Sequence, residues 1–189
     1  MPDPLITFLK KFRDVSPDEG LIMAAAEQRS YKEGEVLLKE NTIPREIFFI
    51  YNGVLKITSV NDKGADVTYF FLKENQFCTI LQSFQSQQPA RESIVAACDV
   101  EVMAISRVKL YELYAQRPYI EELINSIVQR RLLEKIQIRN SYMGQDAATR
   151  YRIFMEQEPE LALRVPLADI ASYLCITPQS LSRIRKNIR

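Results

Sequence analysis

The chain has 189 residues, of which 47% are hydrophobic and 26% are charged, and its formal net charge is +1. This composition is ordinary for a globular protein with one or two small domains, and no stretch of about 18 apolar residues indicates a membrane span. The N-terminus lacks a basic leader followed by an apolar core, so we expect no secretory signal. Three scattered cysteines (Cys78, Cys98, Cys175) and no histidine make a disulfide framework, a metal site and His-based catalysis unexpected.

The first hundred or so residues predict mainly β structure. Short helices are expected over residues 4–12 and 17–26. Short apolar or alternating segments then follow, separated by turn residues such as Asn52-Gly53 and the 61–64 loop. Such spacing predicts a barrel, roll or sandwich. The expected strands are 34–38, 46–51, 54–60, 66–72, 93–97 and 101–105.

A long helical stretch follows these strands. Residues 107–116 predict one helix, and Pro118 begins a second that extends to about residue 141. One apolar stripe of this second helix consists of Ile120, Leu123, Ile124, Ile127 and Val128. Leu132, Leu133 and Ile136 continue the apolar character but, at about 100° per residue, they are rotated from the first stripe. The helix is therefore expected to contact different surroundings along its length.

Residues 142–145 are the expected hinge, with Gly144 as the most permissive backbone position. The segment 146–157 predicts the next helix, with Asp146 suited to its N-terminus. Residues 159–166 then allow a short connection.

The last 25 residues predict two short helices joined by a tight turn. In the first helix, Leu167, Ile170, Ala171 and Leu174 repeat at helical spacing. Thr177-Pro178 is a start signal for the second, in which Leu181, Ile184 and Ile188 form the apolar side. The opposite side carries donors and acceptors suited to bases and phosphates, namely Gln179, Ser182, Arg183, Lys186 and Asn187, with Arg185 on the flank. Two amphipathic helices can also be plain scaffolding, but the final seven residues hold four cations and no anion, which favours nucleic acid.

The run from Ala168 to Lys186 resembles the helix-turn-helix of the Crp–Fnr family of bacterial transcription regulators. Leu181-Ser182-Arg183-Ile184 matches the core of that family's recognition helix. The family usually has glycine after the first helix, where this chain has Cys175, so we expect Cys175 to adopt the left-handed turn at some strain. The chain ends almost with this helix, so any wing is expected to be reduced.

The N-terminal region resembles the cyclic-nucleotide-binding β-roll of the same family. The matching features are Gly34-Glu35, the segment 47–53 and the segment 100–106 that leads into a helix. In family members that bind cyclic AMP, an Arg and backbone N–H groups hold the phosphate and a carboxylate holds the ribose. Here Arg91 can stand for the phosphate arginine, but Glu92 replaces the neighbouring hydroxyl residue, and Thr79 and Ile80 replace the Gly and Glu.

We therefore expect no cyclic AMP binding of the usual kind, and no cofactor. The polar run 82–88 could still line a pocket for another effector. The candidate pocket residues are Thr79, Gln82, Arg91 and Glu92, although Arg91 could equally be an ordinary surface cation.

The sequence thus predicts an α+β fold with an N-terminal double-stranded, jelly-roll-like β-roll, a long dimerisation helix and a C-terminal helix-turn-helix. The expected domains are 1–117, 118–141 and 142–189. The resemblance implies a cytoplasmic, non-enzymatic regulator that binds a palindromic operator in double-stranded DNA as a homodimer, with RNA polymerase as a candidate partner. It also implies that the long helix packs on its own roll and on the partner's copy, and the expected dimer-helix residues are Ile120, Leu123, Ile124, Ile127 and Val128. The alternative for this helix is burial within one chain only. The regulator's expected base contacts are Gln179, Ser182 and Arg183, and its expected phosphate contacts are Thr177, Arg185 and Lys186. The alternative is a ligand-sensing or protein-docking module that does not bind DNA.

Overall fold

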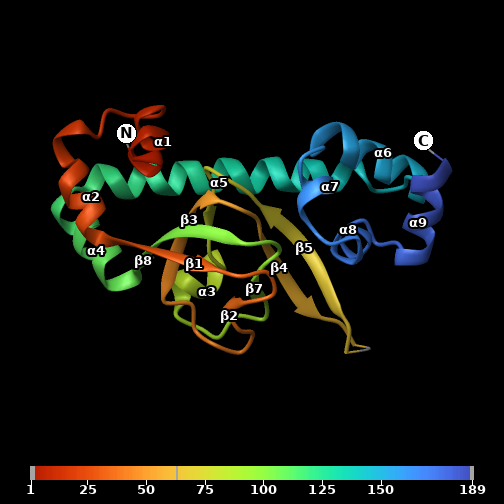
Figure 1. The fold of residues 1–189 in the computed structure, drawn as a ribbon. Coiled ribbons are helices and arrows are strands. Elements are labelled where there is room, and N and C mark those ends of the chain that lie inside the picture. The colour runs from red at the N-terminus through yellow and green to blue at the C-terminus, as the bar shows by residue number, and fades with distance from the viewer. Residues whose placement is uncertain (1–2, 63, 188–189) are drawn as a thin grey trace.

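The computed structural model describes residues 3–62 and 64–187 (Figure 1). Its N-terminal half contains two four-stranded antiparallel sheets, with strand orders β1-β8-β3-β6 and β2-β7-β4-β5. The predicted mixed fold with a double-stranded β-roll is confirmed. The strands are β1 (Ala26–Tyr31), β2 (Val36–Leu38), β3 (Glu46–Asn52), β4 (Leu55–Val60), β5 (Asp66–Leu72), β6 (Phe77–Cys78), β7 (Ser93–Ala96) and β8 (Val100–Ser106).

The central strand β3 is buried on both faces, which explains its continuous apolar sequence. Phe48 and Ile50 point into the core between the two sheets, and Ile47 and Phe49 point to the opposite face. This alternation follows from the two-residue period of a strand. The hairpin turn after β3 needs Gly53, whose φ is +99° and whose absent Cβ would lie 2.4 Å from the Asp99 carbonyl oxygen.

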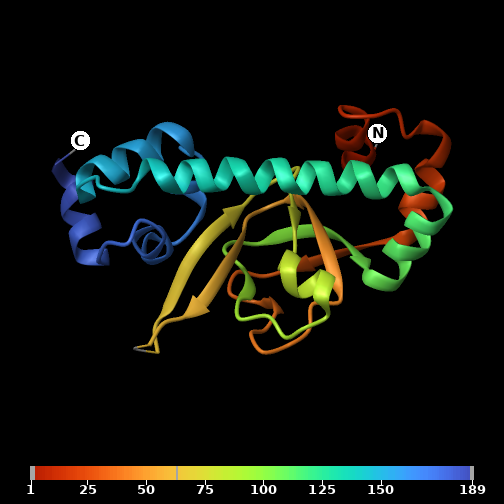
Figure 2. The ribbon, with the colours of Figure 1, turned by 180° about the vertical axis from the view of Figure 1, so that it is seen from behind.

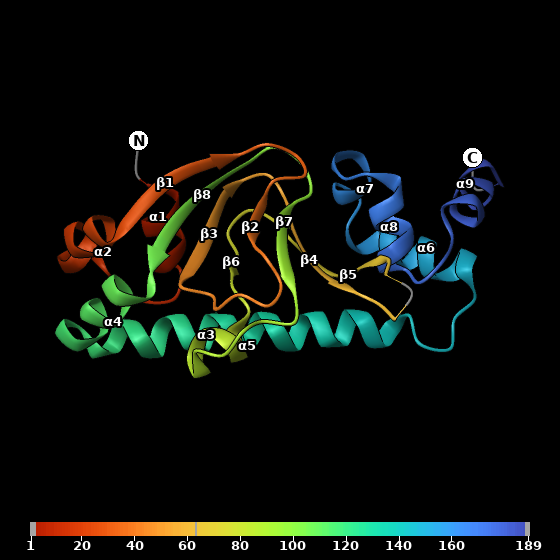
Figure 3. The same ribbon diagram turned by 90° about the horizontal axis from the view of Figure 1, so that it is seen from below.

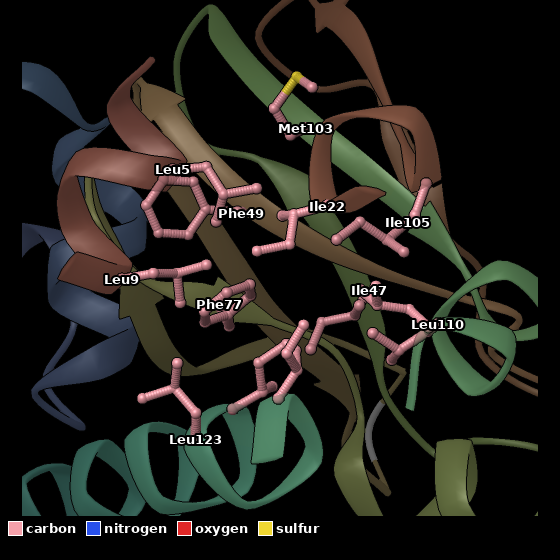
Figure 4. Packing of buried hydrophobic residues seen from close by; sticks show 14 of the residues in the cluster. Leu5, Leu9, Ile22, Ile47, Phe49, Phe77, Met103, Ile105, Leu110 and Leu123 are labelled. Carbon is pink, nitrogen blue, oxygen red and sulfur yellow. The ribbon is translucent and has the colours of Figure 1, made fainter. Parts of the chain in front are cut away.

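Helices cover the outer face of the sheet that contains β3. They are α1 (Pro4–Lys10), η1 (Ser16–Asp18), α2 (Glu19–Ala25), α4 (Arg107–Gln116) and α5 (Pro118–Ser141). Figure 4 shows their apolar side chains, such as Leu5, Leu110 and Leu123, meeting Phe49 and Ile105 from the sheet. The largest of these side chains are almost fully buried, so this core is expected to contribute most of the roll's hydrophobic stabilisation.

The long helix α5 runs along the whole molecule, from the N-terminal helices to the C-terminal domain (Figures 1 and 2). Its observed bounds agree with the predicted ones. The chain then turns through Gly144, whose φ of +74° is a conformation that glycine adopts readily, and the hinge role of residues 142–145 stays a prediction. Asp146 caps the next helix, since its carboxylate accepts the Thr149 N–H at 2.8 Å, and this backbone hydrogen bond lowers the pKa of Asp146.

Four helices form the C-terminal domain: α6 (Ala147–Gln157), α7 (Leu161–Arg164), α8 (Leu167–Tyr173) and α9 (Pro178–Asn187). Their core includes Phe154, Ile170, Ala171 and Leu181. No strand occurs between residues 142 and 187, so this part of the chain has no wing. The predicted apolar residue Ile188 lies outside the described residues.

The β4–β5 hairpin of the roll holds the C-terminal domain through α8 (Figure 3). The Lys56 amine lies 2.7 Å from each carboxylate oxygen of Asp169, and both side chains are less than one-fifth exposed. The Thr68 N–H donates to the Ser172 hydroxyl at 2.9 Å. Two apolar residues, Phe71 and Tyr173, pack edge to face at 5.3 Å between ring centroids. Polar and apolar contacts therefore fix the domain on the hairpin.

A second link joins the loop between β5 and β6 to helix α7. The Arg164 guanidinium donates to both Glu74 oxygens, at 2.5 and 3.0 Å, and Glu74 also accepts the Gly53 N–H at 2.7 Å. Burial would raise the pKa of Glu74, but these hydrogen bonds outweigh burial and lower it. Lys73 pairs with Glu158 at 2.6 Å beside this link.

Candidate nucleic-acid interface and ligand cavity

The turn between α8 and α9 has the geometry of a helix-turn-helix. The Ile176 N–H donates to the Ala171 carbonyl at 2.9 Å, and the Cys175 N–H donates to the Ser172 carbonyl at 3.0 Å. These two bonds form a Schellman motif, which requires a left-handed residue just after the helix. Cys175 takes that conformation with φ of 56°, as expected from its place at the family's glycine position.

Helix α9 begins at the predicted Thr-Pro pair. The Thr177 hydroxyl oxygen accepts the Ser180 N–H at 3.1 Å and donates to the Ser180 hydroxyl at 3.0 Å. Pro178 occupies the first helical position, where no N–H is required. The Thr177 side chain is thus engaged in capping while it stays exposed.

The two sides of α9 differ as the sequence predicted. Leu181 is fully buried and Ile184 is half-buried against α6 and α8. The opposite side is solvent-exposed and offers a continuous polar and cationic surface. It consists of Gln179, Ser182, Arg183, Arg185, Lys186 and Asn187. We call this set the α9 outer face.

Helix α9 lies at the end of the molecule that is far from the roll (Figures 1 and 3). Among the described residues, the ion pairs and hydrogen bonds between the roll and the C-terminal domain involve α7, α8 and the end of α6, and none involves α9. Arg150 on α6 stabilises the turn by donating to the Leu174 carbonyl at 3.1 Å. Its guanidinium also donates to the Gln145 carbonyl, just before α6, at 2.9 Å. Sequence reasoning missed this role, because only the folded arrangement brings Arg150 to the turn.

The predicted dimer-helix residues face the protein's own roll. Ile120, Leu123, Ile124 and Ile127 are buried in the roll's outer core, and Val128 is packed against it. The rotated stripe behaves differently, since Leu132, Leu133 and Ile136 are 43, 62 and 43% exposed. One helix therefore carries a covered apolar stripe and an uncovered one.

A cavity of about 310 Å³ lies between the β4–β5 sheet and α5. Most of its lining is apolar, and its polar groups come from both walls. The lining residues are Ile57, Tyr69, Phe70, Leu72, Phe77, Thr79, Ile80, Leu81, Glu92, Ile127, Val128, Arg131, Leu132 and Lys135. We refer to it as the roll cavity.

The four candidate pocket residues separate in the structure. Thr79 and Glu92 line the roll cavity, whereas Gln82 and Arg91 are exposed and do not. Thr79 also donates from its hydroxyl to the Glu46 carbonyl at 3.1 Å, which fixes it in the wall. The residue implied by the resemblance to pair with a phosphate, Arg91, is thus outside the cavity, and a carboxylate is inside it.

The cations of the roll cavity come from α5, and sequence reasoning missed them. Arg131 and Lys135 are three and seven residues after Val128, so they continue the covered apolar stripe on the same helix face. That spacing is the signal that could have identified them. Burial lowers the pKa of the Lys135 amine to about 8.

Comparison with known proteins identifies the roll. Residues 28–117 match the cyclic nucleotide-binding domain family. The comparison with curated protein sequences finds no significant match.

Solved structures share the fold of the whole chain. The c-di-GMP-responsive global regulator CLP of Xanthomonas campestris has a TM-score of 0.71 at 14% identity, over 92% of this chain and 91% of CLP. FixK2 of Bradyrhizobium japonicum also has a TM-score of 0.71, at 17% identity, over 86% of this chain and 84% of FixK2. The catabolite activator protein of Thermus thermophilus has a TM-score of 0.57 at 17% identity, over 96% of this chain and 86% of that protein.

These findings define the class of the molecule as a cyclic-nucleotide-binding-type β-roll joined through a long helix to a helix-turn-helix domain. The fold that the Crp–Fnr resemblance implied is confirmed, since the roll matches by sequence over residues 28–117 and 86–96% of the chain matches these structures by fold. Among the described residues, no helix is long and apolar enough to cross a bilayer.

Proposed function

We propose that this protein is a transcription regulator that binds a palindromic DNA operator as a homodimer. The observation that carries the proposal is the α9 outer face, a polar and cationic helix surface that is exposed at the end of a capped helix-turn-helix. A helix of this kind enters the major groove, where its side chains can contact base edges. The regulators that share the fold support this assignment.

Within this face, the side chains have distinct proposed roles. Gln179, Ser182 and Arg183 lie on the early and middle turns and are proposed to contact bases, since Arg pairs with guanine and Gln with adenine in the major groove. Thr177, Arg185 and Lys186 flank them and are proposed to contact phosphates. Arg185 and Lys186 lie in the last turn of α9, where they also oppose the negative end of the helix dipole.

The homodimer is proposed from the uncovered stripe of α5. Leu132, Leu133 and Ile136 would be buried against the same residues of a second copy, because a two-fold axis along the helix brings identical stripes together. The covered stripe would keep the helix on its own roll. Two copies then present two α9 helices to successive major grooves, about 34 Å apart.

Two substitutions on α9 test the DNA-contact roles by fluorescence anisotropy on the cognate duplex and on random duplex. Arg183→Ala is expected to weaken cognate binding by about 1–3 kcal/mol and to relax specificity at one base pair. Lys186→Ala is expected to weaken both duplexes alike and to reduce the salt dependence by about one phosphate contact.

The exposed Lys32→Ala, whose ion pair with Asp99 lies on the roll, is the control for loss of one positive charge elsewhere. If Arg183→Ala and Lys186→Ala changed both duplexes equally, the division of roles would be wrong. If the wild-type protein bound neither duplex with a salt-dependent affinity, the DNA-binding proposal itself would fail, and a protein-docking role would be favoured.

A further inference from the structure

The roll cavity combines apolar walls with two cationic side chains, Arg131 and Lys135, on its α5 wall. Side chains from β4, β5, β6 and α5 supply aliphatic and aromatic surface, including Ile57, Leu72 and Phe77. Its volume of about 310 Å³ is roughly twice the 150 Å³ of an apolar cavity that holds benzene, so it suits a two-ring or ten-carbon body. Preformed apolar cavities of this size with a few polar groups are typical ligand sites.

The two cationic side chains on the α5 wall differ in their ion pairing. Lys135 forms no ion pair with any described residue, and its amine lies 5.4 Å from the centre of the Phe70 ring. Arg131 lies one turn earlier and pairs at 2.7 Å with Glu134, a pair that is about two-fifths exposed. Burial lowers the pKa of the Lys135 amine, and attraction to the Glu158 carboxylate, which is ion-paired with Lys73, does not offset this effect. A bound carboxylate would supply the missing counter-charge.

The loop wall of the cavity, which carries Glu92, disfavours a nucleotide phosphate. Glu92 lines the cavity and forms no ion pair with the described residues, whereas Arg91 next to it points to solvent. An anionic phosphate held by the β-roll loop would therefore meet a carboxylate rather than a guanidinium. The anion-binding groups are on the helix wall, and the loop wall carries the opposite charge.

We propose that the roll cavity binds an amphipathic organic carboxylate, with its apolar body between β5 and α5 and its carboxylate paired with Lys135 and Arg131. The proposal deepens the proposed function, because such a ligand would be the effector of the regulator. Binding itself does not require that the protein contact DNA.

Isothermal titration of the full chain at pH 7 tests this ligand class. The probes are decanoate and 2-naphthoate, their neutral counterparts decanol and 2-naphthylmethanol, and cyclic AMP and cyclic GMP. We expect at least one carboxylate to bind with micromolar affinity, at least tenfold more tightly than its neutral counterpart, and neither cyclic nucleotide to bind. Cyclic nucleotide binding without carboxylate binding, or no binding by any probe, would overturn the proposal.

Matched variants on α5 locate the carboxylate. Lys135→Met keeps the length of the side chain and removes its charge, so it is expected to weaken carboxylate binding at least tenfold. Arg130→Met removes a charge from the same helix outside the cavity lining and should change affinity less than twofold. Equal affinities for both variants, or equal binding of carboxylate and neutral probe, would show a plain apolar cavity instead.

The pH dependence gives an independent readout. With a pKa of about 8, most Lys135 amines are charged at pH 7 and few are at pH 9, so carboxylate affinity should fall about tenfold over this range. Lys135→Arg keeps its charge and should abolish the fall. The other titratable groups around Lys135 are Tyr69, Lys73, Cys78, Glu92, Arg131, Glu134, Glu158 and Tyr173. Of these, the Cys78 thiol stays neutral because burial raises its pKa to about 12.

Measuring DNA binding on the same preparations separates the two proposals. A protein that binds DNA but no carboxylate retains its proposed function and loses this effector class. A protein that binds carboxylate through Lys135 but no DNA keeps the ligand site and loses the regulator assignment.

Discussion

Cys175 shows how one side chain can sit in a turn that favours glycine. Its φ of 56° lies in the left-handed region, where a Cβ atom comes too close to the following carbonyl oxygen. This conformation costs roughly 1–2 kcal/mol for most residues. The two Schellman hydrogen bonds and the buried Leu174 beside it hold the residue there. The side chain itself is exposed, so its sulfur contributes little packing that would justify the strain.

Replacing Cys175 by glycine is therefore expected to stabilise the protein. The relief of strain exceeds the added freedom of the unfolded chain, so Cys175→Gly should raise the free energy of unfolding by about 0.5–1 kcal/mol. Urea unfolding measures the change. Cys175→Ala is the control, since alanine removes the sulfur and keeps the Cβ. An equal shift of both midpoints would assign the effect to the sulfur and not to the backbone.

The residues of the α9 outer face could be predicted from sequence because a helix repeats every 3.6 residues and the Thr177-Pro178 pair fixes where it starts. Once Leu181 and Ile184 are assigned to the core, the outer residues follow from their spacing. The residues of the roll cavity could be predicted only in part. Thr79 and Glu92 line the cavity as predicted. Lys135 lies more than 40 residues later in the chain, on α5, and only the packed structure brings it to the cavity.

At the level of elements, prediction succeeded where a boundary has a local chemical cause. Helices α4 and α5 have the predicted bounds because Ser106 caps the first, accepting the Lys109 N–H at 3.3 Å, and Pro118 begins the second. Strand β5 was also predicted with its observed bounds, since turn residues precede it.

Elements without such a signal were not predicted. Strand β1 (Ala26–Tyr31) is a polar edge strand. It is held in the sheet by its pairing with β8, and its sequence has no apolar pattern that would predict a strand. Strand β6 has only two residues, and α7 has only four. Helix α3 (Leu81–Ser86) overlaps the polar run 82–88, for which no helix was predicted, and it is anchored by buried Phe84.

The division of α5 into covered and uncovered stripes leads to a prediction about assembly. Leu133 is 62% exposed, so Leu133→Glu should change the stability of a single copy by no more than about 0.5 kcal/mol. In a dimer, the same change would bury two like charges at the two-fold axis. We expect the molar mass measured by multi-angle light scattering to fall from two chains to one.

Leu163→Glu is the matched control, because Leu163 is 86% exposed and lies on α7. It should leave the dimer mass unchanged. A wild-type protein that stays monomeric at high concentration, or a Leu133→Glu variant that stays dimeric, would contradict the assignment of the uncovered stripe.

On the scale of the whole molecule, the roll holds the C-terminal domain by surfaces other than the α9 outer face. The Lys56–Asp169 pair, the Glu74–Arg164 pair and the Phe71–Tyr173 contact all leave the α9 outer face free. Lys135 lines both the roll cavity and a smaller hollow beside it. This smaller hollow lies between the roll and the C-terminal domain, whose Glu158 and Tyr173 also line it. A charge bound at Lys135 would therefore change the electrostatics beside the docked domain, which is how an effector could bias its position.

The account depends most on the proposal that two α9 outer faces contact DNA together. Selection of bound duplexes from a random library by the full-length protein, followed by sequencing, tests it directly. We predict a palindromic consensus whose half-sites are about 10 base pairs apart from centre to centre, and whose enrichment is lost for Arg183→Ala. A library that returns no enriched sequence, or one enriched for a site without two-fold symmetry, would contradict the account.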